Sequence, residues 1–234
     1  QKSLWQRWLF RRVDLVITFS QTTKEIAQET LPVSLRKIKI AGGGIEHVIR
    51  TLREERLVKR IGSIVSGPED LKNIQVIIYA LKGLLPQAND LGIKIEFSIY
   101  ETLQEKSSTE ELRAELVELI QSSNLQEHVF IKESSQFEPV FKETDIFVGT
   151  SFEEPFNDYE IMAVLSRVPV IFPRTASRQS VLYQHKWVGE SYFLEDAREL
   201  KSKLLKLLIN EQVYLNELQD SHQEIKDLHG IEAY

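Results

Sequence analysis

Two adjacent carboxylates, Glu153 and Glu154, follow an apolar run at positions 145–150 that predicts a buried strand. A helical pattern begins a few residues later, so both carboxylates fall in a loop between a strand and a helix. In an open parallel sheet, ligands bind beyond the carboxyl ends of the strands. Carboxylates at such a place can accept hydrogen bonds from sugar hydroxyls or offset a developing positive charge, and the alternative is a solvated acidic loop.

Two other segments contain residues suited to binding an anion. Three consecutive glycines at 42–44 follow a predicted strand, and they can present backbone N–H groups to a phosphate or form a plain tight turn. They do not complete the G-x-G-x-x-G pattern of dinucleotide sites, because Gly44 is followed by Ile45, Glu46 and His47. Lys72 stands near a predicted helix start, where the helix N-terminus also favours an anion; an exposed lysine is an equally good interpretation.

The composition excludes several kinds of site. The chain has 234 residues, a formal net charge of −6 and no cysteine, so disulfides, thiolate metal sites and a cysteine nucleophile are excluded. The acidic balance argues against nucleic-acid binding, and the five histidines lack metal-site spacing, so we expect no metal or cofactor. No apolar run could span a bilayer and no secretory signal is recognisable, and we therefore expect a cytoplasmic protein.

Short β-branched runs alternate along the chain with helical patterns, which predicts an α/β fold with a parallel sheet and helices on both faces. Leucine and isoleucine at spacings of three and four predict helices at 71–85 and 109–122, and two more at 200–209 and 213–228. The expected strands cover 14–19, 37–41, 59–65, 94–100, 128–132, 145–150, 168–172 and 191–194.

The charged segment 46–59 predicts a connector between two regions. We therefore expect residues 1–45 to belong to one Rossmann-like domain, 60–210 to form a second, and 211–234 to be a C-terminal helix. Residues 1–12 combine tryptophan, leucine and basic residues without an acid, as in a helix at a membrane surface. A helix packed on its own domain is an equal alternative.

Several segments, taken in order, resemble the family-4 glycosyltransferases of the GT-B fold. The runs are VDLVITFSQTTKEIA, RKIKIAGGGIE, IGSIVSGPEDLKN and TDIFVGTSFEEPF, followed by VPVI. The resemblance covers nearly the whole chain but starts at the end of the family's first domain. It implies a Rossmann-like domain that binds a nucleotide sugar, with the acceptor-binding domain largely missing or supplied by another chain. It also implies that no bound metal is needed.

The resemblance assigns roles to individual residues. Lys72 matches the lysine that contacts the donor diphosphate, and Glu154 and Phe156 belong to the E-P-F segment whose glutamate faces the donor sugar. Gly44 matches the glycine of the turn at the domain junction. The remaining segment expected to take part, through backbone contacts with the nucleotide base, is Lys132, Glu133 and Ser134.

Other positions depart from the family pattern. Ser63 replaces an arginine that clamps phosphate, and Asn157 replaces a glycine that approaches the donor. Without a gap, the glutamate that holds the ribose falls on Met162 and a family glycine falls on Arg167. In a shifted alignment, with the spacing counted from Glu153 or from Glu154, Glu160 takes the role of the ribose-binding glutamate. A shift of two residues along a helix turns a side chain by ~200°, so this alignment would point the carboxylate in another direction.

The sequence thus leaves two main hypotheses. The first is the donor-binding half of a retaining glycosyltransferase that acts in polysaccharide or glycoconjugate synthesis. The second is a non-catalytic subunit with the same fold that serves as partner or chaperone of an active enzyme, and Ser63, Asn157, Met162 and Arg167 favour it. A third, weaker hypothesis is a Rossmann-like domain that binds an unrelated nucleotide. Under the first, residues 1–12 could place the protein at the inner face of a membrane.

Overall fold

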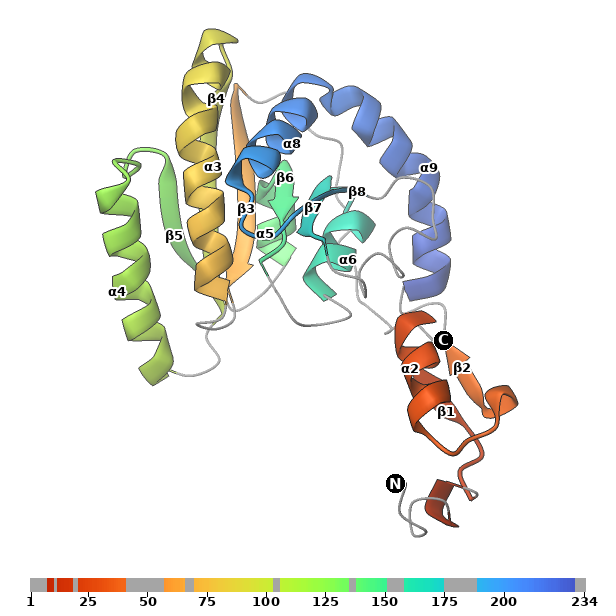
Figure 1. Cartoon of the computed structure of the whole chain (residues 1–234). Coiled ribbons are helices and arrows are strands. Elements are labelled where there is room, and N and C mark those ends of the chain that lie inside the picture. Colours follow the sequence, from red (N-terminus) through yellow and green to blue (C-terminus); the bar gives the residue numbers. More distant parts are fainter. Residues whose placement is uncertain are drawn as a thin grey trace.

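The computed structural model describes residues 8–10, 12–18, 21–40, 57–65, 70–102, 106–134, 138–150, 158–174 and 189–229. Most of the described chain forms a six-stranded sheet with the strand order β5-β4-β3-β6-β7-β8, in which all neighbours run parallel (Figure 1). The strands are β3 (Val58–Val65), β4 (Lys94–Thr102), β5 (Val129–Ser134), β6 (Ile146–Val148), β7 (Val170–Pro173) and β8 (Gly189–Tyr192). The predicted α/β fold with a doubly wound parallel sheet is confirmed.

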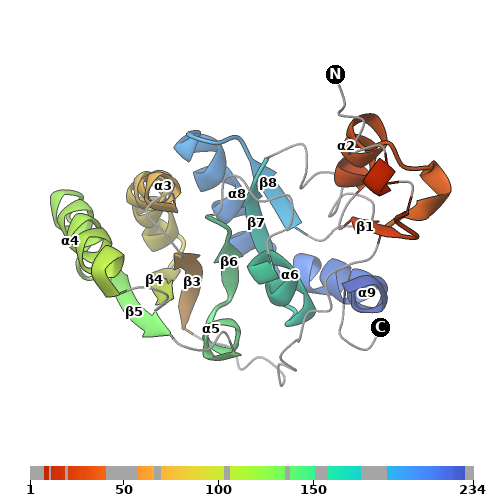
Figure 2. The same cartoon turned by 90° about the horizontal axis from the view of Figure 1, so that it is seen from below.

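Helices cover both faces of this sheet (Figure 2). One face carries α3 (Leu71–Asp90), α4 (Lys106–Ser122) and α8 (Ala197–Ile209), whose apolar residues share a core with the strands. The other face carries α5 (Glu138–Glu143), α6 (Asp158–Leu165) and the middle of α9 (Glu211–His229), around a second apolar cluster. Burial on both faces explains why β6 and β7 are apolar throughout.

A smaller unit stands apart from the six-stranded sheet, near the end of α9 (Figures 1 and 2). It contains β1 (Val16–Thr18), α2 (Gln21–Thr30), a 3-10 turn (Leu35–Lys37) and β2 (Ile38–Ile40), with β1 and β2 parallel. Ile17 in β1 is 54% exposed, because two strands and one helix cannot cover both faces of the pair. The division of the chain expected near residue 45 remains a prediction.

The observed elements differ from the expected ones in a few places. Helices α2 and α5 were not predicted, since α2 is polar and α5 has six residues, too few for a helical period to show. β3 begins at Val58, inside the expected connector 46–59. β8 spans Gly189–Tyr192 rather than 191–194, because Gly189 lies so close to β7 that a Cβ on it would be 2.5 Å from the Val170 carbonyl oxygen. A glycine that reads as a strand breaker is here required by the close approach.

Some predictions concern residues outside the described ranges. Most of the expected surface helix 1–12 is among them, as are 41–56 with Gly44. In the described part of the chain, no helix is both long enough and apolar enough to cross a membrane.

Candidate functional site

Buried side-chain hydrogen bonds join the carboxyl ends of β3 and β6, beyond the point where their backbones pair. The Ser63 hydroxyl donates to the Val148 carbonyl oxygen over 2.8 Å, and the Thr150 hydroxyl donates to the Ile64 carbonyl oxygen over 2.6 Å. Backbone pairing of the two strands is confined to Ile61 with Ile146 and Gly62 with Phe147. The two side-chain hydrogen bonds therefore extend the contact between β3 and β6 beyond their backbone pairing. They hold the carboxyl ends of the two strands next to each other.

The first turn of α3 is attached to the same place. Asn73 is buried, and its side-chain amide donates to the Thr150 carbonyl oxygen. This bond holds the N-terminal turn of α3 beside the carboxyl end of β6. Helix N-termini carry unpaired N–H groups and favour negative charge, so this edge of the sheet suits an anionic ligand.

Lys72 is the cation at this helix start, one residue before Asn73. Its side chain is 66% exposed, and the ammonium group forms an ion pair with Glu195, whose side chain is 63% exposed. Glu195 follows β8, so it also lies at the carboxyl edge. The hydrogen bond from Lys72 holds the pKa of Glu195 below its ordinary value. The lysine expected at the phosphates is therefore paired with a carboxylate of the protein itself.

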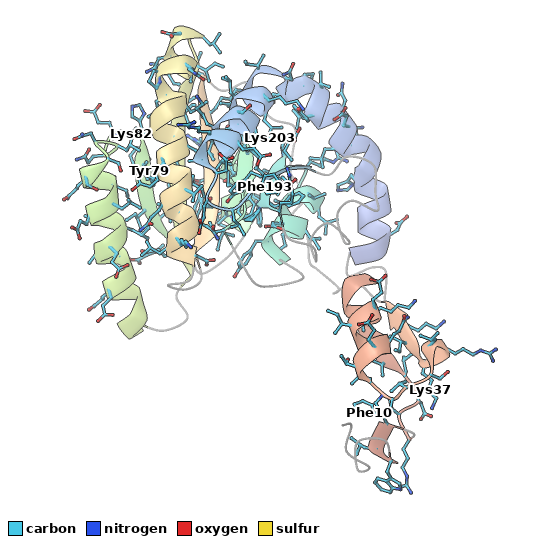
Figure 3. The ribbon with its side chains drawn as sticks, viewed as in Figure 1. Phe10, Lys37, Tyr79, Lys82, Phe193 and Lys203 are labelled. Carbon is cyan, nitrogen blue, oxygen red and sulfur yellow. The ribbon has the colours of Figure 1, made fainter. Side chains whose placement is uncertain are left out.

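A second cation at this edge, Arg174, follows β7. Its guanidinium group lies over the Phe193 ring at 4.0 Å from the ring centroid, and it donates to Glu199 over 3.0 Å. Figure 3 shows Phe193 at the end of β8 beside α8. Arg174 also donates to the Ser191 hydroxyl over 3.2 Å, and all three partners come from the β8–α8 region and hold the arginine against its own domain.

The segment Lys132–Ser134 ends β5 and pairs in register with β4, from Tyr100 opposite Lys132 to Thr102 opposite Ser134. The Lys132 ammonium donates to Glu143 over 3.0 Å and lies 5.4 Å from the centroid of the Tyr100 ring. Burial acts to lower the pKa of Lys132, but the hydrogen bond to Glu143 and the electrostatic interactions with Tyr100 and Glu143 together outweigh it, and the pKa is raised. The Lys132 ammonium group is thus paired with residues of its own domain, although its side chain is 39% exposed.

Glu101, at the end of β4, is a residue that the sequence reasoning missed. Its side chain is 1% exposed, neither carboxylate oxygen accepts a hydrogen bond from the described residues, and its ion pair with Arg113 has an N–O distance of 3.5 Å. Burial raises the pKa of Glu101, against the lowering effect of Arg113. Arg113 also binds the exposed Glu133 over 2.5 Å. The available signal was an acidic residue that follows the alternating apolar residues Ile95, Phe97 and Ile99.

Helix α6 contains the two residues that the alternative alignments with the glycosyltransferase family assign to the ribose, Met162 without a gap and Glu160 in the shifted alignment. Glu160 is buried, and its carboxylate lies against Gly149, where a Cβ would collide with it. Met162 is half-buried. Arg167 follows the helix with φ of +56°, in the left-handed region that favours glycine.

The structure brings some of the predicted site residues together and leaves others outside the described ranges. The carboxyl ends of β3, β6 and β5 lie at one edge of the sheet, because all their pairings are parallel, and β4 separates β3 from β5. Ser63 and Lys72 lie at the β3–β6 junction, with the Ser63 side chain directed into the sheet. The predicted residues outside the described ranges are Gly44, Glu153, Glu154, Phe156 and Asn157. Among the described residues, no group of three or more His, Cys, Asp or Glu side chains could hold a metal.

No family model and no curated protein sequence matches the chain. Solved structures do match it. HepE from Anabaena, solved with UDP, has a TM-score of 0.78 at 15% identity over 97% of this chain and 63% of its own. A mutant of TarM from S. aureus, solved with fondaparinux, α-GlcNAc-glycerol and UDP, has a TM-score of 0.73 at 16% identity.

These matches also bear on which part of the fold is present. The match to TarM covers 96% of this chain but 43% of the TarM chain. The C-terminal domain of LpcC, a group 1 glycosyltransferase from Francisella tularensis, matches 72% of this chain and 84% of its own, with 16% identity and a TM-score of 0.52. At these identities the likeness concerns the fold. The chain therefore has the fold of the GT-B glycosyltransferases, and its match to LpcC lies in the C-terminal domain.

Proposed function

We propose that this chain is the nucleotide-sugar-binding half of a retaining glycosyltransferase. The observation that carries the proposal is the junction of β3, β6 and α3, where Ser63, Thr150 and Asn73 tie three carboxyl-edge segments together beside Lys72. A fixed helix N-terminus with a cation beside it is an arrangement that binds a diphosphate.

Each part of the donor has a proposed partner. Lys72 and the N-terminus of α3 neutralise the diphosphate, including the charge that develops when it leaves the sugar. The backbone of Lys132–Ser134 holds the base, and Glu154 positions the sugar. The acceptor, from a polysaccharide or glycoconjugate pathway, is bound by a further domain or a partner chain. UDP is the first ligand to test, since the HepE and TarM structures contain it.

A second candidate is a non-catalytic subunit that keeps the fold and assists an active glycosyltransferase. The observation that favours it is the backbone of Arg167, whose positive φ agrees with a glycine at this position and therefore with the alignment that has no gap. In that alignment Met162 takes the place of the ribose-binding glutamate. Ser63 stands in place of the phosphate-clamping arginine, and its hydroxyl donates a hydrogen bond to a backbone oxygen of β6.

Calorimetry with UDP and with uridine tests the proposed donor site. We expect Lys72→Ala to weaken UDP binding by about 1.5 to 3 kcal/mol, the range for a hydrogen bond to a charged group, and to leave uridine binding unchanged. Lys82→Ala is the matched control, because Lys82 is an exposed lysine further along the same helix (Figure 3). Equal losses for UDP and uridine, or equal effects of the two variants, would contradict the phosphate role of Lys72. Absence of UDP and uridine binding would reject the donor site for this nucleotide.

A further inference from the structure

The turn between β8 and α8 carries acidic residues that have different partners. Asp196 caps α8, since its carboxylate accepts hydrogen bonds from the backbone N–H groups of Arg198 and Glu199 at 3.0 Å and 2.9 Å. Glu199 accepts from the Phe193 N–H at 2.6 Å and binds Arg174. Both therefore stabilise their own turn. Glu195 is different, because its carboxylate pairs with Lys72 of α3, the cation of the proposed phosphate site.

The backbone holds Glu195 in this place. Its φ of +68° lies in the left-handed region, which is costly for a residue with a side chain unless the surroundings impose it. Helices α3 and α8 also pack closely, since a Cβ on Gly83 of α3 would be 3.2 Å from Cδ of Lys201 in α8. The N-terminus of α3 and the turn before α8 thus have a fixed separation, and the carboxylate of Glu195 stays within reach of Lys72.

We propose that Glu195 sets the affinity of this site for nucleoside diphosphates, by neutralising Lys72 in the empty site and competing with the diphosphate for its ammonium group. This inference rests on the proposed role of Lys72. When a diphosphate binds, the carboxylate gives up its ion pair and stays nearby as a negative charge. Both effects weaken the binding of the diphosphate. An exposed ion pair is weak, so the exchange is feasible, and a weakened grip on the product diphosphate favours its release.

Removing the charge of Glu195 tests the proposal. We expect Glu195→Gln to tighten UDP binding roughly two- to five-fold, the size of effect of one exposed ion pair, and to leave uridine binding unchanged. In a Lys72→Ala background, the same substitution should gain less, because the ammonium group for which the carboxylate competes is gone. Glu195→Asn is the second variant, since asparagine tolerates a positive φ and also lacks the charge.

Glu211→Gln is the matched control for the loss of a lysine–glutamate pair. Glu211 binds Lys59 near the amino end of β3, at the opposite edge of the sheet, so UDP affinity should not change. Unchanged or weaker UDP binding by both folded Glu195 variants, with Lys72→Ala still harmful, would overturn the inference and leave the donor site in place. If none of the variants nor the parent binds UDP, the proposed donor site fails, and the inference fails with it.

Discussion

Glu101 is a carboxylate at the end of β4 whose burial has a measurable consequence for stability. In the folded protein its pKa is raised above the ordinary value of 4.5, first because burial disfavours the charged form, whereas the unfolded chain ionises it normally. The folded state therefore loses stability as the pH rises from 4.5 through the raised pKa, and the loss is complete at higher pH. Below 4.5 both states hold the proton and the loss vanishes.

We expect Glu101→Gln to stabilise the protein at neutral pH by about 1 kcal/mol, since burying an amide costs less than burying a charge. The gain over the parent should shrink as the pH falls to about 4, and thermal unfolding of both proteins across this range measures it. Glu133→Gln is the control, because Glu133 is exposed and pairs with the same Arg113. A Glu101→Gln variant that is less stable at neutral pH would show that the ion pair with Arg113 outweighs burial.

At the level of elements, three helices end in the same C-terminal motif. After α3, the N–H of Ile93 donates to the Ala88 oxygen and that of Gly92 to the Asn89 oxygen. The same pattern follows α4 at Asn124 and α6 at Arg167, and the three central residues have φ of +72°, +56° and +56°. Glycine and asparagine suit this left-handed position, and an arginine there strains the backbone.

We expect Arg167→Gly to raise the free energy of unfolding by about 1 kcal/mol, because glycine adopts the left-handed conformation without a clash between Cβ and the backbone. Arg167 is exposed, so little packing is lost. Arg167→Ala should give no comparable gain, since alanine keeps the Cβ. Thermal or denaturant unfolding of the two variants measures these free energies. An equal increase in the free energy of unfolding for Arg167→Ala would show that the side chain of Arg167, rather than its backbone conformation, is unfavourable.

At the level of the whole molecule, the question is whether the protein transfers sugar. The chain spans 63% of HepE and 43% of TarM, and the proposed function assigns acceptor binding to a further domain or a partner chain. We expect the chain alone to show no transfer, because holding donor and acceptor together supplies much of the rate enhancement.

With a preceding domain or partner chain that binds the acceptor, we expect Glu154→Gln to lower transfer by about 10²-fold or more, as for the loss of a transition-state electrostatic contact. The measurement is the rate at which sugar is transferred from the nucleotide sugar to the acceptor. Turnover that does not depend on Glu154 would contradict the site assignment. Stable assembly without turnover on any nucleotide sugar would favour the non-catalytic subunit.

The sequence by itself determined the α/β class and most of the strands and helices of the large sheet. These elements have strong apolar patterns: β3 lies within one residue of the predicted 59–65, and α3 begins at the predicted Leu71. The motif order also predicted the GT-B fold and the place of Lys72 at a helix start. Such features depend on local residue order, which periodicity and short motifs record.

Only the tertiary structure decided how charged side chains pair across elements. Nothing in the sequence links Lys72 with Glu195, which lies more than a hundred positions away and belongs to a different strand–helix unit. The burial of Glu101 and the use of Ser63 to join β3 to β6 were equally invisible, since both depend on strand order and helix docking. An ion pair or a desolvated carboxylate arises from distances between elements, and these distances are set by packing rather than by any local pattern.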